Sequence, residues 1–483
     1  MREHLRHDTR IRRVLIAAGI YLAVVAVFFA STARERLIAH TPYNHFALLA
    51  EAWLDGNLHL SGAPPGYAKN NDFASYGGHW FVTFPGFPAL LLVPVVKFAG
   101  SAEAVRDGQI FVWLAGVGPA VLFLALEKLR RSGHSQRSST TNAALAILFA
   151  FGTVYYFSAV QGTVWFAAHV VGVGLSALYL LFTIDASRPA LAGLMIAFGF
   201  WTRSPLLFAV PLFAFEALRV CTKRPEQALA SQLSGWLKRG VEALIDGAQE
   251  RPSPVDGRSR LAEGVGRWRD RLLGWWACVE KARLLKMYLA FSVPILGALG
   301  LAFLHNELRF GDPLDFGYKY LKVAWATRME KWGLFHFHYL GRNLGVVFSG
   351  LPWPMASGAV PFKINTHGLA LWFTTPIYLW LLWPRVKRAP HWALWLTVAA
   401  VAVPTLFYQN TGWAQFGYRF SNDYAIYLFA LLAIGGRRFH FGFWTLAIWC
   451  VVVNTFGALT FERHEMRRFY HSDASQKVLH QPD

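Results

Sequence analysis

Apolar runs long enough to cross a lipid bilayer recur along this sequence, and they restrict its fold more than any other feature. The first run covers residues 14–30 (VLIAAGIYLAVVAVFFA) and carries no charged side chain. In lipid every backbone polar group needs a partner within the protein, so only helices and closed barrels can span a membrane. These runs are continuous and lack the alternating pattern of barrel strands. The sequence therefore predicts an all-α polytopic membrane protein.

The composition agrees with this class, since 54% of the 483 residues are hydrophobic and 16% are aromatic. A soluble globular protein rarely has so many apolar residues in uninterrupted runs. We expect about 11–13 transmembrane helices and a large first outer loop. The spans are predicted near residues 14–31, 109–127, 142–160, 165–184, 189–203, 204–219, 287–304, 368–384, 391–408, 423–435 and 440–460.

Two other hydrophobic segments do not fit a regular span. Residues 87–100 (FPALLLVPVVKFAG) are short and contain Pro94, and a crossing there would place the next basic loop on the outside. We expect a re-entrant or interfacial helix, with a short true span as the alternative. Residues 344–360 are interrupted by prolines, which disfavour a regular helix, and are interpreted in the same way.

The net charge of +19 is explained by membrane topology. In a soluble protein such a charge would suggest nucleic acid, but here the Lys and Arg residues cluster between spans, as the positive-inside rule requires. We therefore expect a multi-pass protein of the cytoplasmic (inner) membrane that does not bind nucleic acid. Its N-terminus is predicted to be cytoplasmic and its C-terminus to lie outside. The three cysteines, Cys221, Cys278 and Cys450, lack the spacing of a metal site.

The chain divides into three predicted parts. Residues 1–218 form an N-terminal transmembrane module that includes an outer loop at 31–108. Residues 219–286 form a basic, amphipathic cytoplasmic insert, for which a place on the inner leaflet and a solvated linker are both open. Residues 287–483 form a C-terminal transmembrane module.

Three polar segments face outside in this topology: 31–108, 305–367 and 409–422. A carboxylate near the membrane surface can act as a general base toward an acceptor hydroxyl. An arginine can hold a lipid-linked phosphate, and aromatic faces with Gly-rich turns can form a sugar-sized pocket. The alternative interpretation is that these residues have a structural role only, because Tyr and Trp also form interfacial belts, and Gly and Pro also mark turns.

Three short motifs in these segments carry a resemblance to a known family. They are residues 84–88 (FPGFP), 308–318 (LRFGDPLDFGY) and 416–423 (FGYRFSND). Together with the large first outer loop they resemble the GT-C superfamily of integral membrane glycosyltransferases. The resemblance includes the dolichyl-phosphate-mannose mannosyltransferases and the aminoarabinose transferases, and it covers most of the chain outside 219–286.

This resemblance implies a lipid-linked sugar donor, namely a polyprenyl-phosphate sugar, and an acceptor glycan, lipid or protein. Many relatives place an acidic residue just after the first span, whereas this chain has Asn44 and His45 there. The general base is therefore sought elsewhere, with Asp72 first and Asp55 or Glu51 next. If none of these serves, the chain is an inactive or repurposed member.

The predicted function is transfer of a sugar from a polyprenyl-phosphate carrier to an acceptor on the outer face of the cytoplasmic membrane. A transporter or flippase of a lipid-linked intermediate is the rival, and a non-catalytic membrane scaffold is a third reading. Inverted repeats would favour a transporter, and none is evident. No cofactor is assigned, and a divalent metal stays open. The residues expected to bind substrate are Asn44, His45, Tyr76, His79, Arg203, Arg309, Tyr318, Arg419 and Asp423.

Overall fold

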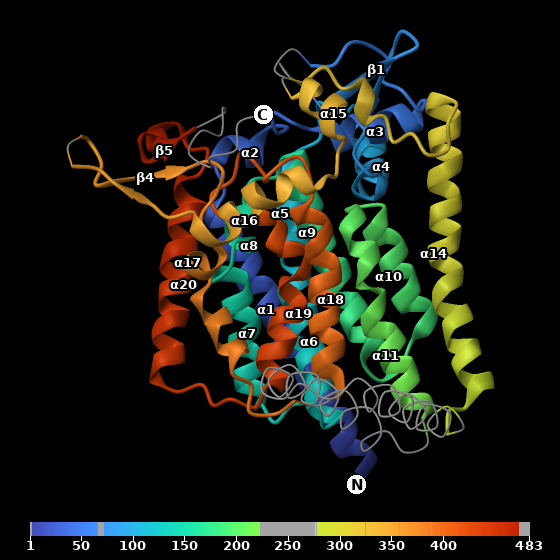
Figure 1. Cartoon of the computed structure of the whole chain (residues 1–483), viewed down its shortest axis with the longest axis vertical. Helices are drawn as coiled ribbons and strands as arrows, with labels where there is room; N and C mark the ends of the chain where they lie inside the picture. Colours follow the sequence, from blue (N-terminus) through green and yellow to red (C-terminus); the bar gives the residue numbers. More distant parts are fainter. Residues whose placement is uncertain are drawn as a thin grey trace, which may run out of the picture.

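The computed structural model describes residues 2–65, 72–222, 276, 278–323, 325–356, 358–387 and 389–472. It is a bundle of roughly parallel helices, and the all-α polytopic class predicted from the sequence is confirmed. One end of the bundle, here called the loop face, carries residues 41–65, 311–323 and 407–421. The opposite end, the basic face, carries residues 132–138 and 435–440 and lies on the side of the N-terminus (Figure 1).

Six segments of the described chain are long and apolar enough to cross a membrane. Most of them coincide with predicted spans, because continuous apolar runs of this length have no other stable environment. They are formed by α1 (Arg2–Ser31), α5 (Asp107–Ala115) with α6 (Val117–Arg131), α9 (Val164–Thr183), η2 (Ser204–Ala209) with α11 (Val210–Cys221), α14 (Lys281–Phe310) and α20 (Phe441–Thr460).

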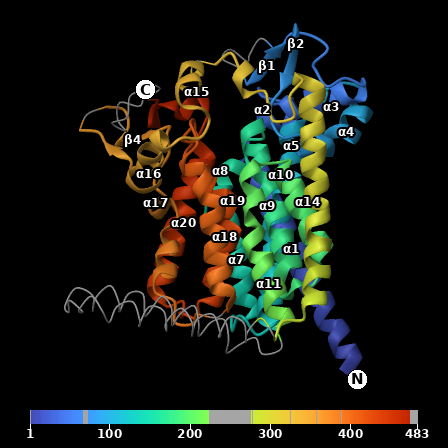
Figure 2. The same ribbon diagram turned by 45° about the vertical axis from the view of Figure 1, so that its right-hand side comes forward.

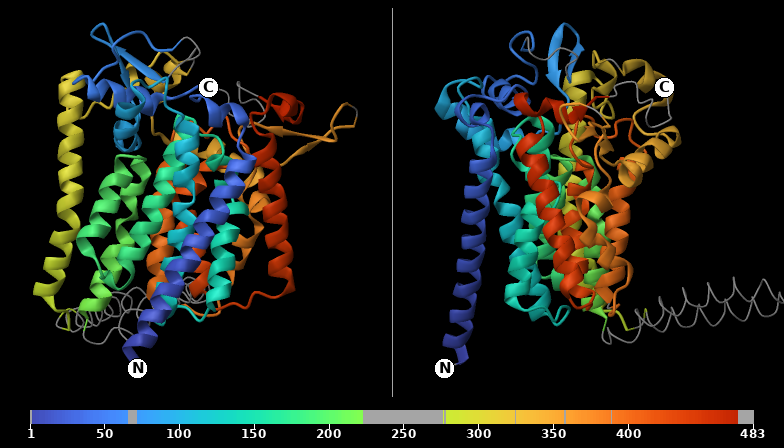
Figure 3. Two further views of the ribbon diagram at one scale, coloured as in Figure 1. Left: turned by 180° about the vertical axis from the view of Figure 1, so that it is seen from behind. Right: turned by 90° about the vertical axis from the view of Figure 1, so that its left-hand side faces the viewer.

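Shorter helices complete the bundle between these long ones. Figure 3 shows α1 running obliquely across the back of the bundle. The shorter helices are α7 (Ser139–Phe151), α8 (Tyr155–Ala159), η1 (Ile184–Ala186), α10 (Pro189–Phe200), α18 (Ala389–Leu406) and α19 (Asn422–Ile434).

The predicted span at 368–384 does not form one regular helix. It contains the four-residue α17 (Leu371–Thr374) and the 3-10 helix η5 (Pro376–Leu382). Pro376 has no backbone N–H to continue the ladder, which explains the break. Asn454 of α20 donates to the carbonyl of Thr374 at 2.8 Å, so a neighbouring helix partners part of this irregular backbone.

α19 lies at the centre of the bundle, and all thirteen of its residues are buried. It packs against α9, α18 and α6, so its apolar surface faces protein and not lipid. Asp423 lies in its first turn, at the loop face. The central helix thus places one carboxylate deep at that end of the bundle.

The loop face is built from small elements that pack over the helix ends. Figure 2 shows them in two groups, with the hairpin of β1 and β2 above α10 and α14 and the remaining strands near α20. The elements are α2 (Arg34–Ile38), α3 (His45–Leu54), β1 (Phe73–Tyr76), β2 (His79–Val82), α4 (Phe87–Ala99), η3 (Tyr318–Tyr320), α15 (Ala326–Trp332), η4 (Phe337–Tyr339), α16 (Leu340–Ser349), β3 (Trp353–Pro354), β4 (Phe362–Asn365), η6 (Arg419–Ser421), η7 (His464–Phe469) and β5 (Tyr470–His471).

The strands form two small sheets. β1 and β2 pair antiparallel with Tyr76 opposite His79, and Gly77 and Gly78 between them have positive φ values of 56° and 80°. A two-residue turn with both φ values positive is the usual connection of a tight hairpin, and glycine adopts it without strain. β4 pairs antiparallel with β3 and parallel with β5. The first hairpin fixes the chain directly after Asp72.

α4 corresponds to the predicted re-entrant or interfacial helix at 87–100. It begins beside the end of α10, where the N–H of Phe87 donates to the carbonyl of Trp201 at 2.8 Å. The segments on both sides of α4 lie on the loop face, so α4 does not traverse the bundle (Figure 1). Pro94 lies inside it.

The predicted insert at 219–286 lies mostly outside the described residues. Its two ends meet, because Thr222 and Val279 form a β-bridge and the N–H of Glu280 donates to the carbonyl of Cys221 at 2.9 Å. This junction lies at the basic face, on the same side as the N-terminus (Figure 3). The division into two transmembrane modules stays a prediction, and α10 of the first packs extensively on α14 of the second.

Candidate functional site

The first two turns of α9 organise a group of charged residues at the loop face. Three of its side chains each contact a different charged residue of the site: Trp165 contacts Asp72, Phe166 contacts Arg419, and His169 contacts Asp423. Positions 165, 166 and 169 are neighbours on an α-helical surface, since residues four apart lie one turn above each other. We call the group of Asp72, His169, Arg203, Arg419 and Asp423 the loop-face cluster.

Arg203 and Asp423 form the central ion pair of this cluster. Nε and Nη2 of Arg203 donate to Oδ1 and Oδ2 of Asp423 at 2.6 and 2.8 Å, the bidentate geometry in which guanidinium and carboxylate match best. Nδ1 of His169 lies 3.2 Å from Asp423 Oδ1, at ion-pair distance but outside hydrogen-bond geometry. The carboxylate of Asp423 is fully buried and is held by an arginine from the α10–η2 turn.

Asp72 has the properties of a proton acceptor. Its Oδ2 accepts a hydrogen bond of 2.8 Å from the indole N–H of Trp165. Burial raises the pKa of Asp72 to about 6, against the opposing effects of the Trp165 hydrogen bond and the positive charge of Arg419. A carboxyl group with this pKa is mostly ionised at neutral pH, and it is a stronger base than an ordinary aspartate.

Arg419 contributes a buried cation to the loop-face cluster. Its side chain is 6% exposed, its Nε has no hydrogen-bond partner among the described residues, and none of them forms an ion pair with it. The guanidinium packs on the rings of Phe166 and Phe420, at 5.0 and 5.7 Å from their centroids. Burial, together with the charge of Arg203, lowers the pKa of Arg419 to about 9, so it remains charged at neutral pH.

Arg309, the other arginine predicted to hold a phosphate, is engaged in the protein itself. Its Nη1 donates to the carbonyl of Val82 at 3.1 Å and its Nη2 to Oδ1 of Asn306 at 2.9 Å. The first bond fastens the end of α14 to β2, and the second lies within α14. The neighbouring Asp312 accepts from the N–H of Leu314 and does not pair with Arg309. The two arginines predicted to bind phosphate therefore differ. The guanidinium of Arg419 makes no hydrogen bond to a described residue, whereas that of Arg309 donates to Val82 and Asn306.

The other two candidate bases lie apart from the cluster. Glu51 accepts a hydrogen bond of 3.0 Å from the N–H of Ala102, which ties α3 to the segment after α4. Asp55 follows the last residue of α3 and is exposed. Of the three candidate bases, Asp72 is the one that interacts with another residue of the loop-face cluster, Arg419.

Asn44 and His45, which the sequence analysis predicted to bind substrate, are buried at the start of α3. The ring of His45 stacks on Phe73 with 4.1 Å between centroids, and burial lowers its pKa to about 3. His45 is therefore a neutral packing residue beside Asp72. Its ring supports the chain directly after the proposed base.

Tyr76 and His79 lie at the exposed tip of the hairpin and face other partners. Tyr76 packs on Tyr320 at 4.5 Å between centroids, and His79 stacks on His59 at 4.0 Å. Tyr318 lies nearer to the cluster. The pKa of Tyr318 is raised, mainly by burial and then by the charges of Tyr408 and Asp72.

Glu462 is a charged residue near the cluster that the sequence did not single out. It follows the last span, has an unusual positive φ of 53°, and its carboxylate lies 2.9 Å from Nη2 of Arg36. The pKa of Tyr43 is raised by burial and then by the charges of Glu462 and Asp72, so both carboxylates act on one tyrosine. Arg419 also feels the charge of Glu462. The sequence feature that could have identified Glu462 is its position as a carboxylate directly after an apolar run.

Trp165 and His169 are not among the residues that the sequence analysis expected at the site. The sequence offers a weak signal for both, since an aromatic and a histidine occur four residues apart at the start of an apolar run. Their partners, Asp72 and Asp423, are 93 and more than 200 residues away in the chain. A local sequence pattern does not predict contacts over such separations.

One group of described residues has metal-ligand types close together, and it lies at the opposite end of the molecule. Ligand atoms of His134, Asp185 and Glu216 all lie within 4.8 Å of one another. The guanidinium of Arg219 donates to Asp185 at 2.5 Å and to Glu216 at 2.9 Å, so an arginine already supplies the positive charge there. We interpret the group as an ion-pair network joining η1 and α11.

Comparison with known proteins gives distant structural similarity. No protein-family model matches the sequence, and no curated protein matches it either. The structure is similar to archaeal oligosaccharyltransferase AglB from Archaeoglobus fulgidus in complex with an inhibitory peptide and a dolichol-phosphate, with a TM-score of 0.43 and 13% identity. It is also similar to the Archaeoglobus fulgidus oligosaccharyltransferase tethered with an acceptor peptide, with a TM-score of 0.41 and 14% identity. Each similarity covers 92% of this chain, which spans 56% and 54% of the two oligosaccharyltransferase chains.

Proposed function

We propose that this protein is a membrane glycosyltransferase that transfers a sugar from a polyprenyl-phosphate carrier to an acceptor hydroxyl at the loop face. The observation that carries the proposal is that a basic carboxylate, Asp72, lies near a buried guanidinium, Arg419, that forms no ion pair with the described residues, at one end of a membrane bundle. The two groups are close enough for their charges to interact. A base and an anion-binding cation at the membrane boundary are what such a transfer requires.

In the proposed reaction the acceptor oxygen attacks the anomeric carbon while the bond from that carbon to the phosphate oxygen breaks. Asp72 takes the proton of the acceptor hydroxyl, and the sugar inverts its anomeric configuration. A positioned base of this kind contributes about 10²–10⁴ to the rate. The Trp165 N–H holds the Asp72 carboxylate in place at 2.8 Å.

Arg419 acts on the leaving group. The carrier phosphate is a singly charged diester while it bears the sugar, and it becomes a monoester of higher charge as the sugar departs. A cation already held in a poorly hydrated position stabilises that gain of charge mainly in the transition state. Arg203 adds positive potential nearby, although its guanidinium is paired with Asp423.

Full-length protein in lipid vesicles, supplied with a panel of radiolabelled polyprenyl-phosphate sugars and mixed acceptor lipids and glycans, tests this function. We expect release of polyprenyl phosphate together with label on an acceptor, and loss of both in Asp72→Asn. Asp55→Asn is the matched control, because it removes an exposed carboxylate of the same loop. Movement of donor between leaflets without cleavage, retained in Asp72→Asn, would identify a transporter and overturn the proposal.

A further inference from the structure

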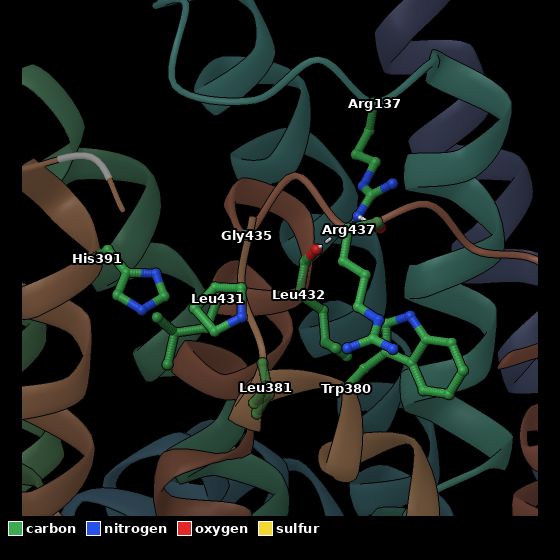
Figure 4. A pocket seen from close by; sticks show the side chains of 9 residues that line it. Arg137, Trp380, Leu381, His391, Leu431, Leu432, Gly435 and Arg437 are labelled. Carbon is green, nitrogen blue, oxygen red and sulfur yellow. Dashed lines mark hydrogen bonds between the residues drawn. The ribbon is translucent and has the colours of Figure 1, made fainter. Parts of the chain in front are cut away.

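A small pocket opens at the basic face, at the opposite end of α19 from the loop-face cluster. Its walls come from the α6–α7 loop, η5, α18, the end of α19 and the segment after α19. Figure 4 shows Arg137 and Arg437 on one side of this pocket, with Trp380 beside Arg437, and His391 on the other.

Arg137 brings an incompletely paired guanidinium into the pocket wall. Its Nη2 donates to the carbonyls of Arg437 and Leu432 at 2.6 and 3.1 Å. The central guanidinium carbon, Cζ, lies 3.7 Å from the ring centroid of Phe439. Its Nε is buried and has no hydrogen-bond partner among the described residues. Burial lowers the pKa of Arg137 to about 10, with no carboxylate opposing that effect.

Arg437 supplies a second positive charge. Its guanidinium lies 4.9 and 5.9 Å from the ring centroids of Trp380 and Trp383, and no described residue forms an ion pair with it. The stacking leaves the edge of the guanidinium plane for other partners, since the ring contacts its face. Tryptophan beside arginine is also the usual composition at the depth of lipid headgroups.

His391 adds a buried donor from α18. It is 3% exposed, and its Nε2 accepts a hydrogen bond of 3.2 Å from the indole N–H of Trp395. In a neutral imidazole the other nitrogen then carries the proton, as assigned from this hydrogen bond. That nitrogen, Nδ1, is buried and has no hydrogen-bond partner among the described residues.

None of the described residues that line this pocket is acidic. Two arginines and a buried N–H donor therefore surround a small space in which no described residue supplies an anion to balance them. Burying unsatisfied polar and charged groups is costly. We propose that the pocket binds the headgroup phosphate of an anionic membrane lipid. The phosphate would accept hydrogen bonds from Arg137 and Arg437 and balance their charge.

The surroundings of the pocket favour a lipid over a free phosphate. Leu379, Leu382 and Trp383 next to it are exposed, with 41%, 59% and 62% of their surface accessible. Large apolar side chains exposed on a protein are typical of surfaces that bind a membrane or a partner. A lipid can cover this apolar rim while its phosphate reaches the arginines, whereas a free phosphate leaves the rim uncovered.

The test uses full-length protein in nanodiscs of phosphatidylcholine with increasing phosphatidylglycerol. Lipid retained after transfer to detergent is counted by native mass spectrometry, and the melting temperature is measured in parallel. We expect Arg137→Gln and Arg437→Gln each to weaken phosphatidylglycerol retention about tenfold, the loss of roughly one charge-assisted hydrogen bond. Arg438→Gln is the matched control, since it removes an exposed charge next to the pocket.

Each outcome decides the proposal. Equal retention in all three variants and the wild type would overturn it, as would an equal loss in Arg438→Gln. If inorganic phosphate in phosphatidylcholine discs raises the melting temperature as much as phosphatidylglycerol does, the ligand is a free phosphate and the lipid assignment is wrong. If Arg137→Gln fails to fold, Arg437→Gln decides alone, because its side chain makes no hydrogen bond among the described residues.

Discussion

The carboxylate of Asp423 is bound by Arg203, from the turn between α10 and η2, and not by Arg419, which lies four residues before it in the chain. This pairing settles which positive charge at the loop face is already neutralised. Arg203 and Asp423 form a closed pair, and Arg419 keeps an open guanidinium. We therefore expect the two arginines to have different roles, and substitutions at these sites to separate structural from catalytic effects.

Asp423→Asn should lower the free energy of unfolding by about 3–5 kcal/mol, because it leaves a partly buried arginine without its counter-ion. Combining it with Arg203→Gln should recover part of that loss, since both charges are then gone. Thermal unfolding in detergent measures the effect. Asp312→Asn is the matched control, because Asp312 is exposed and an asparagine can still accept from Leu314. Equal melting temperatures for Asp423→Asn and the wild type would contradict the structural role.

Asp72→Asn should reduce sugar transfer by about 10²–10⁴ while the protein remains folded. The amide has nearly the same shape as the carboxylate and can still accept from Trp165, but it cannot take a proton. Turnover with saturating donor is the measurement, and Asp55→Asn should stay close to the wild type. Near-normal turnover in Asp72→Asn would move the role of base to another carboxylate.

The rate of transfer should fall below pH 6, about tenfold for each further pH unit, because only ionised Asp72 acts as a base and its pKa is raised to about 6. The stability of the folded protein should depend on pH in the opposite direction. Since the folded state binds this proton more tightly than the unfolded state, the contribution of Asp72 to stability is full below its ordinary pKa of 3.8 and is lost as the pH rises through about 6.

Asp72→Asn removes this titration, so its melting temperature at pH 7 should equal or exceed that of the wild type. A pH-rate profile and melting curves between pH 4 and 8 check both signs. A rate independent of pH between 5 and 7 would disagree with Asp72 as the base.

Arg419→Lys should lower turnover by about 10²–10³ and weaken donor binding, because a lysine keeps the charge but loses the planar fork that matches a phosphate. Arg309→Lys should act on stability instead, by about 1–3 kcal/mol, since it breaks the bonds to Val82 and Asn306. Donor titrations and melting curves of both variants make the comparison. Reversed effects would assign the phosphate to Arg309.

Membrane orientation is tested by cysteine labelling with an impermeant reagent, in a variant whose native Cys278 is replaced. Ser61→Cys lies on the loop face and Gln136→Cys on the basic face, and both positions are exposed. We expect labelling of position 61 in intact cells, and of position 136 only after permeabilisation, because the basic segments should stay inside. The reverse pattern would invert the proposed topology.

The sequence predicted the helical bundle well because long apolar runs have few alternatives in lipid, as α9 and α20 show. It failed where the backbone departs from a regular helix, at 368–384, since hydropathy counts apolar side chains and does not measure backbone regularity. It also could not distinguish Arg309 from Arg419. Both lie beside glycine and aromatic residues, and the difference between them comes from Val82 and Asn306, which already bind the donors of one of them.

Among the candidate residues, Asp72, Arg203, Arg419 and Asp423 come together in the structure, and whether they act in catalysis stays a prediction. Tyr76 and His79 lie at the hairpin tip, away from this group. They follow Asp72 closely in the sequence, but the tight Gly77–Gly78 turn carries them away from it. Sequence proximity to a reactive residue is a weak guide wherever the chain forms a hairpin.

The partners of the Arg203–Asp423 pair are separated by 220 residues of chain, and this separation has a consequence for biosynthesis. The ribosome completes α9 and α10 long before it reaches α19, so Arg203 and His169 enter the membrane without their carboxylate. A lone arginine at that depth is costly and must stay near the lipid surface or a temporary partner. Arrival of Asp423 removes that cost, and the central helix is therefore held in place by the half of the protein that was inserted first.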